Sequence, residues 1–191
     1  MTRSPPTHGF EWKHREDPYA THQPVLYEAI RRTEGLPGAV VELGCGYNST
    51  KLIHETAGKR VVYSLDHDRE WVSRFEHMAT PNRRFHLITS WYEILNYFAS
   101  ETDLSVVFID QGDWDSREQC VEFFKNRAEL VVIHDSDGMK GQPWINFSDH
   151  YKFVKTFVPP DPRPYETGPP TSIMSNNTDV TVWEINYADY K

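Results

Sequence analysis

The sequence predicts an α/β fold in which helices cover both faces of a mostly parallel sheet. Short runs of apolar, often β-branched residues alternate along the chain with segments whose apolar residues recur at helical spacing. A glycine-rich turn at residues 44–46 follows the first of these runs. The length of 191 residues, with 38% hydrophobic content, fits one domain with enough chain to bury a core.

The elements follow one another in a regular order. Residues 1–19 are polar and contain three prolines, so we expect an N-terminal arm there, followed by a single domain over residues 20–191. The expected helices are residues 23–32, 49–56, 68–78, 91–99 and 116–126. The expected strands are residues 40–43, 60–65, 85–89, 104–109, 130–133, 151–158 and 180–185. A proline-rich loop is expected over residues 159–170.

Composition excludes several classes of protein. The net charge of −8 argues against a broad phosphate-binding face, so we expect no nucleic-acid partner. Cys45 and Cys120 provide no disulfide framework and suit a reducing compartment. Because no signal-like stretch and no apolar run long enough to span a membrane is present, we expect a cytoplasmic protein without a membrane span.

The turn after the first expected strand is typical of a nucleoside-cofactor site. Residues 40–50 read V-V-E-L-G-C-G-Y-N-S-T, and Gly44 and Gly46 allow the backbone to approach a ligand closely. Asp66 lies about 20 positions downstream, where an acidic residue can accept hydrogen bonds from the two hydroxyls of a ribose. The alternative is a plain strand–turn–helix corner with two glycines and no ligand.

Glu42 and Ser49 indicate which nucleoside is bound. A carboxylate just before the turn repels a pyrophosphate at the helix N-terminus but attracts an ammonium group. Ser49 also replaces the third glycine of the dinucleotide fingerprint. The sequence therefore favours a cofactor that contains an amino acid and a ribose over a dinucleotide.

On these residues the chain resembles the class I, Rossmann-like methyltransferases that use S-adenosylmethionine. Their first motif has the form E-x-G-x-G, which matches residues 42–46, and the acidic residue that ends their second strand matches Asp66. The resemblance covers roughly residues 20–187. It implies a three-layer α/β sandwich with a mostly parallel seven-stranded sheet and an antiparallel last strand.

The resemblance also implies the parts of the cofactor site. Glu42 and the turn backbone would bind the methionine part, Asp66 the ribose, and Ser90 with Trp91 the adenine. Trp91 is equally compatible with a core position at the start of a helix. The full set of expected cofactor-binding residues is Glu42, Gly44, Cys45, Gly46, Asp66, His67, Ser90, Trp91 and Asp110.

Acidic residues and a histidine end the fourth and fifth expected strands. Asp110, His134 and Asp135 should meet at one edge, because the carboxyl ends of parallel strands lie together. Methyl transfer to oxygen requires removal of a hydroxyl proton, so these are the candidate catalytic residues. In one route, Asp110 and Asp135, helped by Ser136 or Asp137, bind magnesium or another divalent cation.

In the other route no metal is bound, and His134 or Asp110 is the base. Acids at these two strand ends resemble those of the metal-dependent small-molecule O-methyltransferases. The catechol-specific type has an asparagine where this chain has Ser136, and a lysine where it has Asp113. His22, just before the first helix, either faces the cofactor or acceptor or is a solvated residue.

Aromatic residues after the fourth and fifth strands suggest an acceptor wall, namely Trp114, Trp144, Phe147, Tyr151 and Tyr165. Each is also compatible with a packing role. The expected function is methyl transfer from S-adenosylmethionine to a hydroxyl of a small molecule, preferably a sugar or glycan. The alternatives are a small-molecule N-methyltransferase and a catalytically silent cofactor-binding partner subunit. A nicotinamide-dependent oxidoreductase is disfavoured by Glu42 and Ser49, and the state of oligomerisation is left open.

Overall fold

A computed structural model describes residues 17–100, 103–138, 145–160 and 168–190. These residues form one seven-stranded sheet with the order β3-β2-β1-β4-β5-β7-β6. Its strands are β1 (Ala39–Leu43), β2 (Val62–Asp66), β3 (Arg83–Leu87), β4 (Leu104–Ile109), β5 (Ala128–His134), β6 (Phe153–Phe157) and β7 (Thr171–Ser175). Strand β7 pairs antiparallel with both β5 and β6, whereas the other pairings are parallel.

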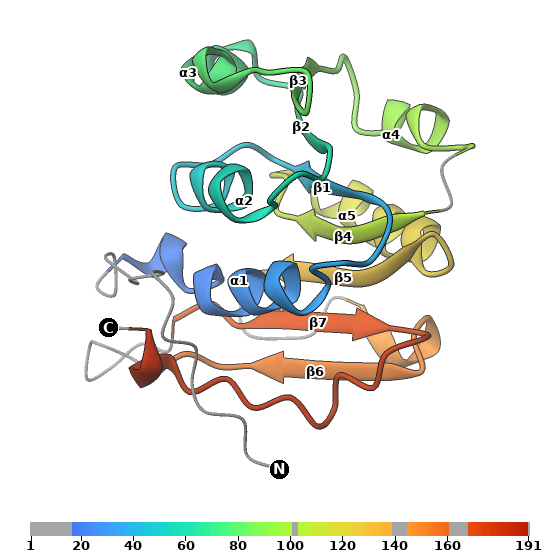
Figure 1. Ribbon diagram of the computed structural model, residues 1–191. Coiled ribbons are helices and arrows are strands. Elements are labelled where there is room, and N and C mark those ends of the chain that lie inside the picture. The colour runs from blue at the N-terminus through green and yellow to red at the C-terminus, as the bar shows by residue number, and fades with distance from the viewer. Residues whose placement is uncertain (1–16, 101–102, 139–144, 161–167, 191) are drawn as a thin grey trace.

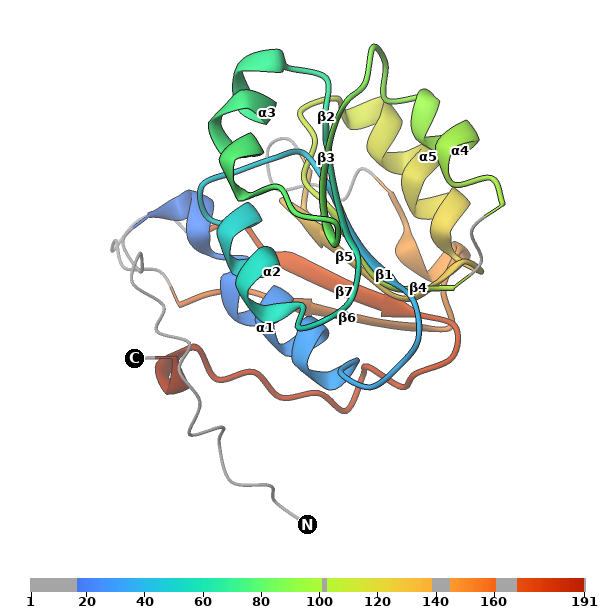
Figure 2. The ribbon, with the colours of Figure 1, turned by 45° about the horizontal axis from the view of Figure 1, so that its top comes forward.

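Helices lie on both faces of this sheet, as Figures 1 and 2 show. The α-helices are α1 (Gln23–Arg32), α2 (Thr50–Thr56), α3 (Arg69–Phe75), α4 (Glu93–Tyr97) and α5 (Trp114–Phe124). Short 3₁₀ turns are η1 (Pro18–Ala20), η2 (Glu76–Met78), η4 (Phe147–Asp149) and η5 (Tyr187–Asp189). Helices α1, α2 and α3 cover one face, and α4 and α5 cover the other (Figure 2). The predicted three-layer α/β sandwich is confirmed.

The core is divided by the sheet into two layers of apolar side chains. Successive residues of a strand point to opposite faces, so Val106 and Phe108 pack toward α1 while Val107 and Ile109 pack toward α5. All six residues of β4 are buried. Strands covered on both faces are nearly continuously apolar, as β4 is apart from Ser105.

The position predicted for the last strand is wrong. Residues 180–185 form no strand; the antiparallel strand is β7, which pairs with both β5 and β6. The apolar residues Val180 and Trp183 pack instead against the core layer on the α1 side of the sheet. Their spacing therefore reflects burial of an irregular segment rather than a strand.

Asp17, the first described residue, is hydrogen-bonded to the rest of the domain. The Asp17 side chain accepts a hydrogen bond from the Tyr19 N–H and caps η1, and its other oxygen accepts one from Asn48 Nδ2 at 3.0 Å. Residues 1–16 of the predicted arm lie outside the described residues. Among the described helices, none combines the length and apolar character that crossing a membrane requires.

Candidate active site

The glycine turn after β1 fits closely against the end of β4. Gly44 has a φ of +93°, and a Cβ at this position would lie 2.7 Å from the carbonyl oxygen of Asp110. The Gly44 N–H donates to the Leu65 carbonyl of β2, and the Asp110 N–H donates to the Leu43 carbonyl of β1. Glycine is thus required here by the neighbouring backbone, which joins the ends of β1, β2 and β4 at one edge of the sheet.

Asp66, at the end of β2, is hydrogen-bonded directly to this turn. Its Oδ2 accepts from the Cys45 N–H at 2.8 Å, and its Oδ1 accepts from the Asp68 N–H at 2.9 Å. A carboxylate has roughly four lone-pair positions, so Asp66 retains lone pairs for further donors, and 7% of its side chain is exposed. The predicted ribose-binding residue therefore lies beside the turn predicted to bind the methionine part.

Glu42 lies beneath the turn with no exposed surface. The hydroxyl of Thr50, in the first turn of α2, donates to one carboxylate oxygen at 2.9 Å, and Ser64 of β2 donates to the other at 2.6 Å. Glu42 thus links β1, β2 and the start of α2. In this arrangement a direct contact with an ammonium group would require the turn to move.

Burial raises the pKa of Glu42 to about 7, although the hydroxyl donors oppose this change; the charge of Asp110 adds to it. The folded protein therefore binds more protons than the unfolded chain between about pH 4.5 and pH 7, and this contribution to stability is lost as the pH rises through that range. Glutamine resembles the neutral form of Glu42, so Glu42→Gln should be more favourable to stability at pH 8 than at pH 5. We expect the difference between variant and wild type in free energy of unfolding to be on the order of 2 kcal/mol larger at pH 8. Urea unfolding at the two pH values measures this difference.

Glu28 provides a control, because its replacement by Gln should change stability with pH in the opposite direction. It is also buried, but hydrogen bonds from Arg31 and Arg32 outweigh the effect of burial and lower its pKa. Glu28→Gln should therefore destabilise the protein at pH 8 more than at low pH. If Glu42→Gln changed the free energy of unfolding equally at pH 5 and pH 8, the raised pKa of Glu42 would be contradicted.

His67 lies next to Asp66, and Trp91, one of the two residues predicted around the adenine, lies close to His67. His67 Nδ1 is 3.3 Å from Asp66 Oδ1, and the His67 ring is half-exposed, with its centroid 5.3 Å from that of Trp91. Trp91 is buried in the core layer facing α4 and α5, and its indole N–H has no hydrogen-bond partner among the described residues. Ser90 is half-buried and accepts a hydrogen bond from the Tyr92 N–H. The structure thus brings Asp66, His67 and Trp91 together.

The ends of β4 and β5 form the second half of the site. Asp110 Oδ1 is 3.3 Å from His134 Nδ1 and 3.3 Å from Arg117 Nη2. Burial alone would raise the pKa of Asp110, but the neighbouring His134 lowers it below its usual value. Burial likewise opposes protonation of His134, yet the charge and hydrogen bond of Asp110 hold the pKa of His134 above its usual value.

Arg117 is a residue of this site that the motifs did not reveal. It lies on α5, is almost fully buried, and donates hydrogen bonds to the carbonyls of Gln111 and His134 as well as to Asp110. It therefore connects the segments that follow β4 and β5. Its position along the chain could have revealed its burial, because Arg117 lies at helical spacing from Cys120, Val121 and Phe124, which share a buried helix face.

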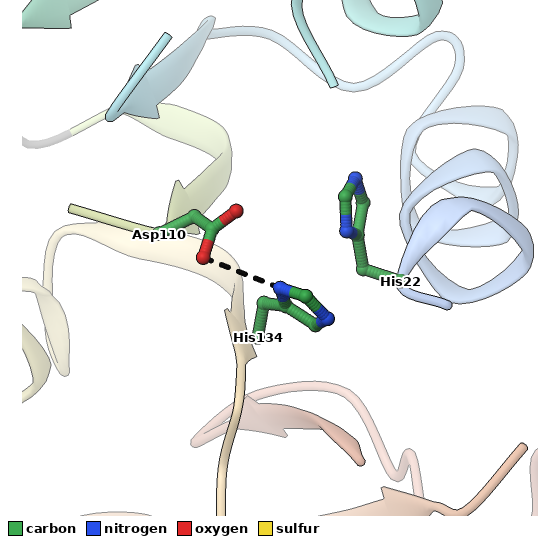
Figure 3. A group of neighbouring side chains, drawn as sticks. All are labelled: His22, Asp110 and His134. Carbon is green, nitrogen blue, oxygen red and sulfur yellow. Dashed lines mark hydrogen bonds and ion pairs between the residues drawn. The ribbon is translucent and has the colours of Figure 1, made fainter. Parts of the chain in front are cut away.

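His22 lies close to the same pair of side chains. It is 1% exposed, its ring centroid is 4.6 Å from that of His134, and Figure 3 shows its ring facing Asp110 and His134. Burial, together with the neighbouring His134, lowers the pKa of His22 to about 3. The solvated alternative for His22 is therefore wrong.

Asp135 and Ser136 follow at the end of β5. Asp135 has a φ of +52°, an uncommon conformation for a residue with a side chain, and its side chain is 33% exposed. Burial raises the pKa of Asp135 above its usual value. Among the described residues, the group with metal-ligand spacing combines Asp110 with His22 and His134, and does not include Asp135. The hydroxyl of Ser136 is buried without a partner among the described residues.

The predicted acceptor wall is only partly present. Tyr151 is a core residue whose hydroxyl donates to the Val121 carbonyl, and Trp114 lies beneath the guanidinium of Arg117. Trp144 and Tyr165 lie outside the described residues. Phe147 is buried but also lines a cavity of about 480 Å³ next to the end of β5. Polar residues line much of the same cavity, namely Ser136, Asp137, Asn146, Ser148 and Thr156.

Comparison with known proteins agrees with this architecture. No protein-family model and no curated protein sequence matches the chain. Among solved structures, the bifunctional kinase-methyltransferase WbdD is similar to 79% of the chain, with a TM-score of 0.54 and 16% identity. The chain spans only 37% of the length of that protein.

Two other similar structures match over most of their own length. An rRNA methylase from Streptococcus thermophilus has a TM-score of 0.52 and 12% identity over 79% of this chain and 93% of its own. An S-adenosyl-L-methionine methyltransferase from Silicibacter pomeroyi has a TM-score of 0.51 and 18% identity over 85% of this chain and 95% of its own. The strand order, the antiparallel β7 and these similarities agree: the chain has the fold of the class I, Rossmann-like methyltransferases.

Proposed function

We propose that the protein transfers a methyl group from S-adenosylmethionine to a hydroxyl group of a small molecule. The observation that supports this most directly is the hydrogen bond from the Cys45 N–H to Asp66. It joins the E-x-G-x-G turn to the acidic end of β2, so that groups suited to an amino acid and to a ribose lie side by side in a methyltransferase fold.

The two halves of the site have different roles in this proposal. The turn at Gly44–Gly46 and Asp66 bind the methionine and ribose parts of the cofactor, and His67 with Trp91 flanks the adenine. Glu42 supports the turn from below, because its carboxylate is buried and already bonded to Thr50 and Ser64. The acceptor lies on the other side, near the ends of β4 and β5.

Asp135 is the proposed general base. Its carboxylate is the most exposed of the three candidate groups, and its raised pKa favours proton uptake. Bound S-adenosylmethionine would supply the methyl group from its sulfonium, and Asp135 would take the proton that the acceptor hydroxyl loses. His134 is 2% exposed and is engaged at both ring nitrogens, so it is a positioning residue rather than the base.

The cavity beside β5 supports a sugar or glycan as the acceptor. Hydroxyl, amide and carboxylate side chains line it, together with the apolar Phe147, Ile145 and Val154. A polyhydroxylated ring presents both hydrogen-bonding edges and an apolar face, which this lining can match. A flat phenol would leave several of these polar groups unpaired.

Titration calorimetry with S-adenosylmethionine and with NAD tests the cofactor. We expect binding of S-adenosylmethionine alone; binding of NAD alone would overturn the proposal. A methyl-transfer screen with labelled cofactor then compares sugars, glycans, phenols and amines. Labelled products from amines but not from hydroxyl compounds would instead indicate an N-methyltransferase.

A further inference from the structure

We infer that His22, Asp110 and His134 form a binding site for a divalent transition metal of the zinc type. This inference rests on the geometry of the three side chains and does not require the proposed methyl transfer. It also differs from the oxygen-only set of Asp110, Asp135 and Ser136 that the sequence suggested.

The three donor groups lie near enough that small side-chain shifts would let them share one ion. One ligand atom from each residue lies within 4.8 Å of the others, and His134 Nδ1 is 3.3 Å from Asp110 Oδ1. Two atoms bound to zinc at about 2.1 Å and at a tetrahedral angle are roughly 3.4 Å apart. Figure 3 shows the side chains converging from the start of α1 and the ends of β4 and β5.

His22 provides an independent observation. The ring is fully buried; the backbone of Asn48 lies nearby, but neither ring nitrogen makes a hydrogen bond of normal distance and angle among the described residues. A buried polar group without a partner costs about 1–3 kcal/mol, so such groups are rare unless they bind something. His22 faces Asp110 and His134 (Figure 3), where a metal ion would supply the missing partner.

The hydrogen bonds of Thr21 determine which nitrogen of His134 carries a proton. The Thr21 hydroxyl donates its single hydrogen to the Pro169 carbonyl at 2.9 Å, because a carbonyl only accepts. The same oxygen lies 3.0 Å from His134 Nε2 and must therefore accept a hydrogen from it. Nδ1 is consequently the nitrogen that faces the carboxylate of Asp110.

This Nδ1 requires a positive partner, because a lone pair facing a carboxylate oxygen at 3.3 Å is repulsive. A proton satisfies the pair of His134 and Asp110 but leaves His22 without a partner. A metal ion satisfies all three groups. Thr21 then has the role of the outer hydrogen-bond acceptor that orients a metal-bound imidazole.

The donor set indicates the class of metal. Two imidazoles and one carboxylate suit zinc and neighbouring transition metals, whereas magnesium and calcium prefer oxygen ligands throughout. The Asp110 side chain is 23% exposed, and its contacts with Arg117 and His134 are both at Oδ1. Three protein ligands and this opening leave a coordination position for water or for an acceptor hydroxyl, whose pKa such an ion lowers.

Zinc titration of the chelator-treated, tag-free protein tests the site. We expect calorimetry to show one zinc ion per chain, with Mg²⁺ giving no comparable binding. His22→Gln should weaken zinc binding by about a hundredfold or more, and Thr21→Val by roughly ten- to a hundredfold. His54→Gln is the matched control, because His54 is also buried but is hydrogen-bonded to Ser64 at 2.9 Å; its zinc affinity should stay unchanged.

Thermal unfolding gives a second readout, since a ligand that binds only the folded state raises Tm. Zinc should raise the Tm of the wild type and of His54→Gln, but not that of Asp110→Asn, which retains the side-chain shape. Absence of zinc binding in the wild type, or equal zinc binding by the wild type, His22→Gln and Asp110→Asn, would overturn the inference. Titration of S-adenosylmethionine with chelator present tests the proposed function separately. A protein that binds the cofactor but no zinc would contradict the metal site alone, and one that binds zinc but no cofactor would contradict the proposed function alone.

Discussion

Asp66→Ala is expected to weaken binding of S-adenosylmethionine by about a hundredfold or more. Two hydrogen bonds from the ribose to a carboxylate contribute about 3 kcal/mol or more in total, which corresponds to that change in Kd. The substitution also removes the acceptor of the Cys45 N–H and so loosens the turn that should bind the methionine part. Titration calorimetry with the purified variant measures the effect.

Asp68→Ala is the matched control for this prediction. Asp68 lies two residues away and accepts a hydrogen bond from the Glu70 N–H at 2.8 Å, so it caps α3. Its loss should lower stability by about 1 kcal/mol and leave the Kd within about threefold of wild type. If Asp66→Ala folds and binds the cofactor as tightly as Asp68→Ala does, Asp66 has no role in ribose binding.

Arg117→Met is expected to lower the free energy of unfolding by about 3 kcal/mol or more. The methionine fills most of the volume of the arginine stem but leaves the Gln111 and His134 carbonyls without this donor, and it removes one of the two positive neighbours of the Asp110 carboxylate, the other being His134. Removing one partner of a buried ion pair typically costs about 3–5 kcal/mol, because the remaining charge is uncompensated. Urea unfolding followed by circular dichroism gives the value.

Arg127→Met is the control for Arg117→Met. Arg127 follows α5 and is only half-buried; it donates one hydrogen bond to the Phe123 carbonyl and stacks on the Phe123 ring. We expect Arg127→Met to lower the free energy of unfolding by less than about 1.5 kcal/mol. Only one hydrogen bond is removed, and the methionine side chain keeps the contact with the Phe123 ring. Similar losses for the two variants would show that Arg117 does not join the ends of β4 and β5 in the way described.

The parallel part of the sheet was predictable because it is buried on both faces. Strands such as β4 must then be apolar at nearly every position, with Ser105 as the exception in β4, and this gives a clear pattern. Strand β7 escaped prediction for the opposite reason. It reads T-S-I-M-S, and although all five residues are buried, hydrogen bonds satisfy several hydroxyls, as between Ser175 Oγ and the Glu129 carbonyl. Such a strand has no apolar pattern.

The cofactor half of the site was more predictable than the acceptor half. The glycine turn and Asp66 occupy fixed places relative to consecutive strands, so their spacing along the chain locates them. The grouping of His22 with Asp110 and His134 depends on how α1 lies across the sheet, which spacing does not encode. Arg117 was not predicted because a charged residue on a helix is usually exposed to solvent. This one is buried, and its hydrogen bonds compensate for the loss of solvent.

The two hydrogen bonds of Thr21 also bear on the order in which the protein forms during its synthesis. Thr21 is among the first described residues to leave the ribosome, whereas its partners His134 and Pro169 follow 113 and 148 positions later. The glycine turn, Asp66 and the strands β1 to β4 are complete well before then. A nascent chain can therefore form the cofactor half of the site while its acceptor half is still open, and the last contact to close is made by the segment that began the domain.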